Sequence, residues 1–428
     1  MQQLAQPISN TQERLLNLLL LLTGIGLTQS MIIGGLNFSY ADIGFLGLFI
    51  LLVYQHQLKI PVVLTAFFLL IFILRGIVSV WYLPLITPQV TLNIVPSILK
   101  YSLIALYFLV GFSLAQLSRT LVAKLLRYFI WSNVVIGLFG IAISLLNLSS
   151  VFPQLFTAFR YRGLMNDPNY FSMLQLMSVP LINYFYPEQT SLRRTANLIL
   201  ISSALLSGSK SSLFGLGSLL LIYSLLTLIK SFRHGQNLKL LIISLTAGLF
   251  GLIGYLWRTT IVSTMTFIGQ QNPALERISS LFFTDNPLSG SGSGRTDAWH
   301  HAFELLKSTN GLGIGFNDYG QVAYLLFGSP VIAHNTFLQI AVEWGLLFSL
   351  LFFSYLAWQV LRGLVHRDSL TLALTISLLI CLTYFLSISL NNSRIFWSFL
   401  GFWIVYLNQT KGGTLPYEDF NYYGHPQR

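Results

Sequence analysis

The stretch "AHNTFLQIAVEWG" (Ala333–Gly345) combines a polar start with a strongly apolar body. A His-Asn pair opens it, and the apolar run that follows continues to Trp358. About 20 mostly apolar residues are what an α-helix needs to cross the hydrocarbon core of a bilayer. Glu343 lies two turns inside this run, where an unpaired charge costs roughly 2.5–3.5 kcal/mol on the insertion scale. The stretch therefore predicts a membrane helix whose polar residues have partners or a function.

The composition extends this interpretation to the whole chain. The 428 residues are 54% hydrophobic and only 9% charged, whereas a soluble protein carries about 25% charged residues. A soluble surface of this size needs more charge, so the soluble classes are excluded. The net charge of +11 is better interpreted as a topology signal than as affinity for nucleic acid, because the basic residues fall in short loops between apolar runs. The single cysteine, Cys381, excludes an intrachain disulfide.

The apolar runs predict an all-α polytopic membrane protein with about 12 transmembrane helices. These runs lie at 14–34, 40–55, 60–82, 95–117, 126–148, 168–186, 193–208, 211–230, 238–258, 335–358, 370–389 and 393–408. We interpret the first run as a retained span and not as a signal peptide, because it is too long and lacks a small-residue cleavage site. No internal repeat is visible, which disfavours an inverted-repeat transporter.

The distribution of basic residues predicts the orientation. With both termini in the cytoplasm, fourteen Lys and Arg residues fall in cytoplasmic segments and eight in outer segments, as the positive-inside rule requires. Residues 1–258 then contain transmembrane helices 1 to 9, and 259–334 form one large extracytoplasmic loop. Residues 335–408 contain helices 10 to 12, and 409–428 form a cytoplasmic tail. We expect any chemistry to face outward.

The outer loop contains a predicted amphipathic helix at about 295–308. Its apolar side chains recur at the spacing of one helix face: Trp299, Ala302, Phe303 and Leu306. We expect this helix to lie on the outer membrane surface with its aromatic side toward the bilayer. His300 and His301 are interpreted as surface residues of the helix, and His334 lies where the loop re-enters the membrane.

Four motifs in order, over residues of about 155–350, resemble the bacterial O-antigen polymerase and O-antigen ligase superfamily. The first, "RYRGLMNDPNYF", resembles its Arg-x-x-Gly…Asn-Pro-Asn block, with Arg162, or Arg160 two residues earlier, as the arginine. "LLSGSKSSLFGL" looks like its Ser-(Arg/Lys)-Ser turn, with Lys210 in the basic position. "SGRTDAWHHAFELLKSTNGLGIGFNDYG" is similar to its Ser-Gly-Arg…Trp helix and glycine-rich turn. The opening stretch has its His-Asn, nine residues, Gly spacing, at His334, Asn335 and Gly345.

The resemblance implies a fold and a reaction. The fold is that of the multi-span GT-C-class glycosyltransferases with a large outer loop over the active site. The reaction moves a glycan from undecaprenyl pyrophosphate to an acceptor hydroxyl on the outer face of the bacterial cytoplasmic membrane, without a metal or other cofactor. The leaving pyrophosphate carries concentrated negative charge, which arginine can stabilise because its planar fork binds phosphate oxygens in pairs. Arg162 and Arg295 are the main candidates, supported by Arg160 and Lys210.

The acceptor hydroxyl must lose a proton, and a histidine general base typically contributes about 10²- to 10⁴-fold. His334 matches the family position of the proposed base, although a histidine at a helix start can also be a structural cap. Asn335, Gln339 and Glu343 are four residues apart, so they share one helix face. They either shape the pocket or pair with Arg75 or Lys100 inside the bundle.

Three further assignments complete the sequence-based site. Asn169, from the first motif, is assigned to substrate binding. Arg75 either reaches the pyrophosphate or forms a structural ion pair. The run "GLGIG" (Gly311–Gly315) is interpreted as the C-terminal turn of the preceding helix and not as a phosphate cradle.

A polymerase is the favoured activity, because the sequence continues from Gly345 as "GLLFSLLFF", where ligases often have a further glycine-rich run. Lipid-linked oligosaccharides would then be both donor and acceptor. The bilayer, a chain-length regulator and a flippase of the same pathway are the expected partners, and no nucleic acid is expected. Three alternatives stay open: an O-antigen ligase that moves the finished glycan to another acceptor, a lipid-linked oligosaccharide flippase, and a scaffold without chemistry.

Overall fold

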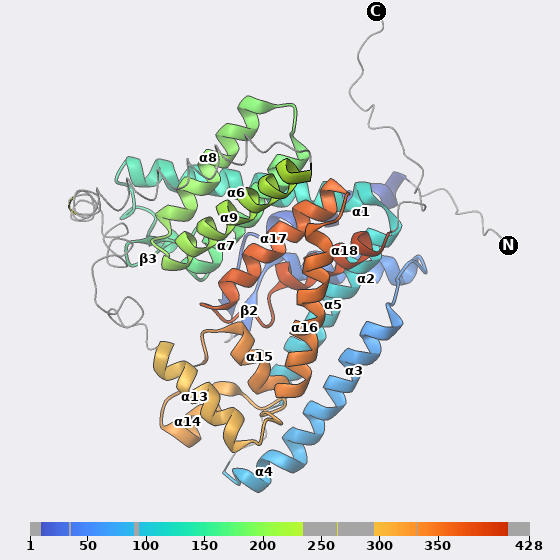
Figure 1. Ribbon diagram of the computed structural model, residues 1–428, viewed down its shortest axis with the longest axis vertical. Helices are drawn as coiled ribbons and strands as arrows, with labels where there is room; N and C mark the ends of the chain where they lie inside the picture. Colours follow the sequence, from blue (N-terminus) through green and yellow to red (C-terminus); the bar gives the residue numbers. More distant parts are fainter. Residues whose placement is uncertain are drawn as a thin grey trace, which may run out of the picture.

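A computed structural model describes residues 10–33, 36–89, 94–233, 263, 295–330 and 332–409, which form a bundle of α-helices (Figure 1). The predicted span at 238–258, residues 259–262 and 264–294 of the predicted outer loop, and residues 410–428 of the predicted tail lie outside these described residues.

The N-terminal half of the described chain consists of helices with two short hairpins between them. In order, these elements are α1 (Asn10–Gly26), β1 (Met31–Ile33), β2 (Leu36–Phe38), α2 (Tyr40–Tyr54), α3 (Val62–Ile77), the π-helix η1 (Val78–Tyr82), α4 (Leu83–Ile86), α5 (Val95–Leu117), α6 (Arg119–Leu145), the 3-10 helix η2 (Pro153–Leu155), β3 (Phe156–Thr157), β4 (Arg160–Tyr161), α7 (Pro168–Phe185), α8 (Thr190–Leu206) and α9 (Lys210–Arg233). Both strand pairs are antiparallel.

The C-terminal part that the structure describes is helical. Its elements are α13 (Arg295–Ser308), α14 (Tyr319–Phe327), α15 (Thr336–Trp344), α16 (Leu346–Leu364), α17 (Ser369–Phe385) and α18 (Arg394–Asn408). In Figure 1, α13, α14 and α15 gather at the end of the molecule opposite α8 and α1.

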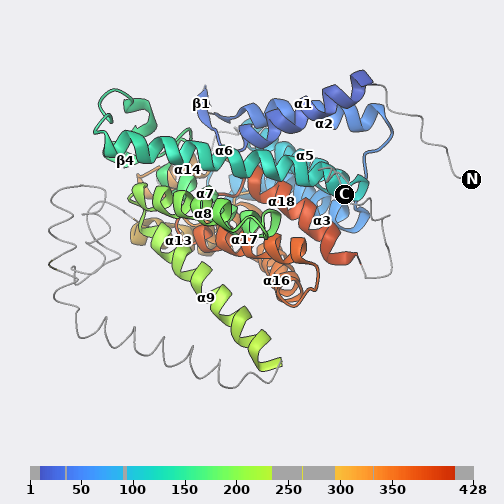
Figure 2. The ribbon, with the colours of Figure 1, turned by 90° about the horizontal axis from the view of Figure 1, so that it is seen from above.

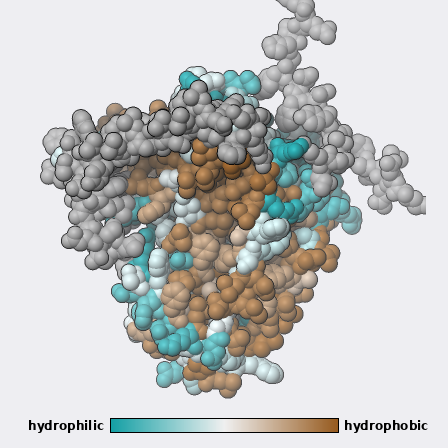
Figure 3. All heavy atoms as spheres, in the orientation of Figure 1, coloured by the Kyte–Doolittle hydropathy of each residue, from teal (hydrophilic) through white to brown (hydrophobic). Residues whose placement is uncertain are grey.

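Five helices within the described ranges are long and apolar enough to cross a bilayer. They are Val62–Ile86, Val95–Leu117, Arg119–Leu145, Lys210–Ile229 and Leu346–Leu364. Tyr40–Tyr54 and Ser369–Phe385 are apolar but shorter. Figure 3 shows a broad hydrophobic surface over the bundle, with hydrophilic atoms gathered at the corner where α13 and α14 lie. The structure supports a polytopic membrane protein, and within the described ranges these five helices have the length and apolarity that a membrane span requires.

The centre of the bundle is formed by α5, α7, α17 and α18, which lie side by side in Figures 1 and 2. All side chains of α7 from Pro168 to Ile182 are buried. Two glycines let α5 and α18 approach closely: a Cβ at Gly401 would lie 2.6 Å from the carbonyl oxygen of Phe108, and one at Gly111 would meet Ser398. This central layer holds the start of α7 and the start of α18 at fixed positions.

The predicted span at 14–34 ends early, at Gly26, and the β1–β2 hairpin follows it. Polar side chains replace the missing helical hydrogen bonds there, since the Ser39 hydroxyl donates to the carbonyl oxygen of Gly26. Ser39 also caps α2, and Asp42 accepts a hydrogen bond from the Ser39 amide. These hydrogen bonds stabilise the end of α1 at Gly26, before the apolar run ends, and the start of α2 after the hairpin.

The predicted span at 335–358 is wrong as a single helix, because it breaks into α15 and α16 at Gly345. Gly345 has a φ of +87°, a left-handed conformation that glycine adopts without strain. The glycine-rich loop packs into the break: the Ile314 amide donates to the carbonyl oxygen of Val342, and the Leu346 amide donates to that of Gly311, both at 2.8 Å. The loop therefore both ends α13 and joins the two halves of the broken helix.

α13 occupies the range predicted for the amphipathic helix, and Ala302 and Leu306 of its predicted apolar face are buried against the protein. Its buried side chains are Ala298, Ala302, Leu305 and Leu306, and the last three join an apolar cluster with residues of α4, α14 and α15. Phe303 is 58% exposed. The helix is turned so that Leu305, and not Phe303, fills the space against the bundle.

The glycine-rich loop generates the first prediction. Gly313→Ala should destabilise the protein, because Gly313 has a φ of +80° and a Cβ there would overlap the carbonyl oxygen of Val342. The left-handed conformation alone costs a non-glycine residue roughly 1–2 kcal/mol. The matched control is Gly217→Ala in α9, where nothing lies within 4 Å of the added Cβ. Thermal midpoints in detergent should fall for Gly313→Ala only; equal midpoints for the two variants would contradict the packing described.

Candidate functional site

A polar cavity of about 190 Å³ lies where four segments far apart in the sequence meet. These are strand β2, the start of α7, the residues before α15, and the α17–α18 loop with the start of α18. Its lining residues are Asn37, Asn166, Asp167, Tyr170, Ile332, His334, Ile388, Ser389, Leu390, Asn392, Ser393 and Arg394. The lining includes amide, hydroxyl, carboxylate, imidazole and guanidinium groups, which is the chemistry of a site for a polar ligand.

His334 is half-buried in the wall of this cavity and has a φ of +47°. A non-glycine residue in this conformation is strained, so its neighbours must hold it. Asn335 caps α15 by accepting a hydrogen bond from the Leu338 amide at 3.1 Å. The Thr336 hydroxyl donates to the carbonyl oxygen of Ile388 at 2.6 Å and accepts from the Leu390 amide at 2.9 Å. These bonds fix His334 against the α17–α18 loop.

The surroundings of His334 favour its neutral form. Burial lowers the pKa of the imidazole, and the positive charge of Arg295 lowers it further, while the carboxylate of Asp167 acts in the opposite direction. The net shift is downward from the ordinary value of 6.5. A neutral imidazole can accept a proton at neutral pH, which is what a general base must do.

Asp167 holds the wall that faces His334. Its carboxylate caps α7, accepting hydrogen bonds from the amides of Asn169 at 2.7 Å and Tyr170 at 3.0 Å. The hydroxyls of Tyr170 and Ser393 are 2.8 Å apart and hydrogen-bonded, which joins α7 to the start of α18. The negative charge beside His334 is therefore fixed by the helix cap.

A buried ion pair that sequence analysis missed forms the deep side of the cavity. Arg394 Nε lies 2.6 Å from Asp42 Oδ1, and Nη2 lies 2.7 Å from Oδ2. Nη2 also donates to the carbonyl oxygen of Asn37, and the Tyr107 hydroxyl donates to Asp42. The two side chains are only 8% and 13% exposed. Asp42 and Arg394 each lie in a predicted span. Charged residues inside spans usually pair with one another, so this was the sequence signal from which the ion pair could have been predicted.

Arg160, Asn169 and Lys210 belong to a second group beside the start of α7. Arg160 donates from Nη2 to Asn169 Oδ1 at 2.9 Å and from Nε to the carbonyl oxygen of Ser207 at 3.0 Å. The Ser209 hydroxyl donates to the same Asn169 oxygen at 2.7 Å, and Lys210 follows as the first residue of α9. The structure thus brings together the first two sequence motifs, although these three residues do not line the cavity.

Arg162 fixes the loop before α7. It donates from Nε and Nη2 to the carbonyl oxygen of Gln154, at 3.2 and 3.0 Å, and from Nη1 to that of Asn166 at 3.4 Å. Its acceptors are neutral carbonyl groups, and the ion pairs found among the described residues do not include it. Arg295 is the first residue of α13, and its positive charge lowers the pKa of the His334 imidazole. Neither arginine lines the cavity itself.

Arg75 and Glu343 lie away from the cavity and pair with each other at 3.7 Å. Arg75 donates to the carbonyl oxygen of Gly315 from Nε at 3.1 Å and from Nη2 at 2.8 Å. Glu343 accepts hydrogen bonds at 2.8 Å from Gln339 and from Asn391. The sequence left open whether Arg75 and Glu343 contact the substrate or form an ion pair, and in the structure they form the ion pair.

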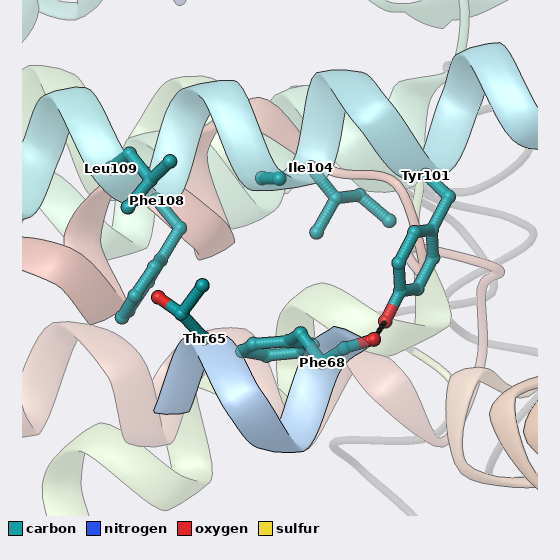
Figure 4. A pocket seen from close by; sticks show the side chains of 7 residues that line it. Thr65, Phe68, Tyr101, Ile104, Phe108 and Leu109 are labelled. Carbon is teal, nitrogen blue, oxygen red and sulfur yellow. Dashed lines mark hydrogen bonds between the residues drawn. The ribbon is translucent and has the colours of Figure 1, made fainter. Parts of the chain in front are cut away.

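A smaller apolar cleft of about 40 Å³ lies between α3 and α5 (Figure 4). It is lined by Thr65, Phe68, Tyr101, Ile104, Ala105, Phe108 and Leu109. The Tyr101 hydroxyl donates to the carbonyl oxygen of Phe68 at 2.8 Å, so the main polar group there is already used. This cleft supplies no reactive group. Within the part of the chain that the structure describes, no cluster of three or more His, Cys, Asp or Glu side chains could hold a metal ion.

Residues 195–353 match a family model described as O-Antigen ligase. The matched segment includes Lys210, Arg295, His334 and Gly345. This finding confirms the resemblance to the O-antigen ligase and polymerase superfamily and supports a membrane enzyme of glycosyl transfer, without separating polymerases from ligases. A comparison with curated proteins gives no match.

The buried ion pair of the cavity generates the second prediction. Asp42→Asn should cost about 3–5 kcal/mol, because it leaves Arg394 buried without a counter-charge. Thermal midpoints in detergent measure this loss, and Asp42→Asn with Arg394→Gln should recover much of it. The control is Glu304→Gln, which breaks the exposed pair with Lys307, whose side chain is 80% exposed, and should cost less than about 1 kcal/mol. Similar midpoints for Asp42→Asn and Glu304→Gln would show that the buried pair is not needed.

Proposed function

We propose that the protein is a membrane glycosyltransferase that polymerises undecaprenyl-pyrophosphate-linked oligosaccharide repeat units on the outer face of the cytoplasmic membrane. One observation carries the proposal: His334, with a depressed pKa, lines a polar cavity opposite Asp167. It also lies inside the segment that matches the O-antigen ligase family model. The products would be O-antigen, capsule or exopolysaccharide chains.

In the proposed reaction, His334 is the general base. An acceptor hydroxyl in the cavity gives its proton to the imidazole while its oxygen forms a bond to the anomeric carbon of the donor sugar. The bond between that carbon and the pyrophosphate oxygen breaks, and the lipid pyrophosphate leaves with the electron pair. The strained and anchored backbone of His334 supports this role, because a base must be held in position before the substrate arrives.

The arginines outside the cavity are proposed to stabilise the leaving pyrophosphate. Arg162 donates only to neutral carbonyl groups, and the described ion pairs leave its charge without a carboxylate partner. Arg295 is close enough to His334 to affect its pKa. Arg160 and Lys210 add positive charge near Asn169. Positive charge already in place where negative charge develops is among the largest sources of catalysis.

An O-antigen ligase is the second candidate, favoured by the description of the matched family model. The same base and arginines would serve a ligase, whose acceptor is a separate molecule and not a second lipid-linked repeat. A flippase is the third candidate, and it has no need for a base with a depressed pKa.

An incubation of the purified protein with undecaprenyl-pyrophosphate-linked repeat units alone separates these candidates. A polymerase should produce a ladder of lengthening products on a gel, and His334→Ala should abolish it. Transfer that requires a separately added acceptor would indicate a ligase. No transfer with either acceptor, together with transport of the lipid-linked unit across vesicles, would replace the proposal with the flippase.

The third prediction concerns the arginines. Arg162→Lys and Arg295→Lys should each lower kcat by about tenfold or more, because lysine keeps the charge but not the two-pronged geometry. Arg193→Lys is the matched control, since Arg193 is exposed and donates only to the carbonyl oxygen of Pro187. Initial rates of sugar transfer measure the effect. Unchanged rates in both test variants would remove the arginines from the mechanism.

The fourth prediction concerns pH. Activity should fall on acidification as His334 becomes protonated, and the depressed pKa places this fall below the ordinary value of 6.5. Arg295→Gln removes a charge that lowers this pKa, so the fall should move to higher pH. Asp167→Asn removes a charge that raises it, so the fall should move to lower pH. Profiles of kcat/KM between about pH 5 and 8 test these signs, and identical profiles for both variants would exclude His334 as the titrating base.

A further inference from the structure

Two residues of the cavity lining each carry a buried polar side-chain atom that has no hydrogen-bond partner among the described residues. These atoms are Asn37 Oδ1 on strand β2 and Ser389 Oγ in the α17–α18 loop, and both are buried. Both residues line the same cavity as His334. Buried polar atoms are normally hydrogen-bonded, so an unpaired one needs an explanation such as a ligand. Two such atoms on residues that line one cavity point to a ligand that carries more than one hydroxyl group.

The charges around these atoms indicate which ligand fits. Arg394 is neutralised by its two contacts with Asp42, and Asp167 contributes another carboxylate to the lining. Among the lining residues, the guanidinium of Arg394 is already paired and the remaining fixed charge is the Asp167 carboxylate, which does not favour a pyrophosphate or a sugar acid. The polar lining is completed by the neutral amide of Asn392, and the side chains of Ile332, Ile388 and Leu390 supply apolar surface. An uncharged sugar ring has both the hydroxyls and the C–H faces that such a lining can contact.

We propose that this cavity is the subsite for the accepting sugar, and that Asn37 and Ser389 orient it. Asn37 Oδ1 accepts a hydrogen bond from one hydroxyl, Ser389 Oγ binds a second, and the reacting hydroxyl faces the imidazole of His334. The assignment rests on the proposed function and adds to it that the accepting residue is uncharged. The volume of about 190 Å³ is smaller than the roughly 300–1,000 Å³ of sites for drug-sized ligands. The cavity therefore takes one ring, and the rest of the glycan lies outside it.

The first test measures glycan binding without turnover. The probe is the free repeat-unit oligosaccharide, released from its lipid carrier, and the protein is the full chain in detergent. Asn37→Ala with Ser389→Ala should weaken binding about tenfold or more, since two hydrogen bonds are lost. The double variant should fold, because neither removed side-chain oxygen has a partner to lose, and its thermal midpoint verifies this.

The matched control is Asn17→Ala with Ser102→Ala. Asn17 contacts Lys124 on the surface, and the Ser102 hydroxyl donates only to the carbonyl oxygen of Ile98 in its own helix. This control should bind the oligosaccharide like the unmodified protein. Absence of binding to the unmodified protein, or equal binding to the test variant, overturns the subsite.

The second test separates the subsite from the proposed function. A fluorescent free oligosaccharide can act only as acceptor and the lipid-linked unit serves as donor, so the acceptor KM is measured alone. The test variant should raise this KM about tenfold with a smaller effect on kcat, whereas His334→Ala should abolish transfer. An unchanged acceptor KM in an active enzyme rejects the subsite and keeps the function. Weakened glycan binding in a protein that transfers nothing keeps the subsite and rejects the function.

Discussion

The buried guanidinium of Arg75 connects three segments at the end of the bundle where α13, α14 and α15 lie. It extends from α3, donates twice to the carbonyl oxygen of Gly315, and lies 4.3 Å from the centre of the Phe316 ring. It also pairs with Glu343 of α15, whose carboxylate accepts from Asn391 in the α17–α18 loop. A buried arginine is tolerated only when its charge and its donors are used. Its partners thus link the glycine-rich loop and the broken helix to the loop that carries Ser389.

The apolar helices were predictable, because a membrane helix requires a continuous run of apolar residues that is visible in the sequence. The run at 95–117 matches α5, and the polytopic membrane class follows from such runs. The β1–β2 hairpin and the break at Gly345 were not predicted, because they arise from capping by Ser39 and from packing by the glycine-rich loop. A count of apolar residues contains no information about either.

Residues of the candidate site were predictable only where they belong to a local sequence motif. His334 and the arginines were found through their motifs, but nothing local indicates that Asp42 pairs with Arg394, 352 residues away. Asn37 lies in a segment predicted to be a loop between two spans, and its position in the cavity depends on that same pair through the hydrogen bond from Arg394. Long-range pairs of this kind form the deep side of the cavity, and they emerge only from the folded structure.

The proposed mechanism assigns different chemistry to two neighbouring regions. The cavity with His334, Asn37 and Ser389 is lined by neutral groups, the Asp167 carboxylate and the paired guanidinium of Arg394, which suits a sugar that must lose a proton. Arg160, Arg162, Arg295 and Lys210 lie outside the cavity lining, where positive charge suits a pyrophosphate. The most direct measurement of this account is a cryo-EM structure of the full chain with the free repeat-unit oligosaccharide. The account predicts a sugar ring between Asn37 and Ser389 with one hydroxyl at hydrogen-bond distance from the His334 imidazole. A glycan bound elsewhere, with the cavity holding only water, would contradict it.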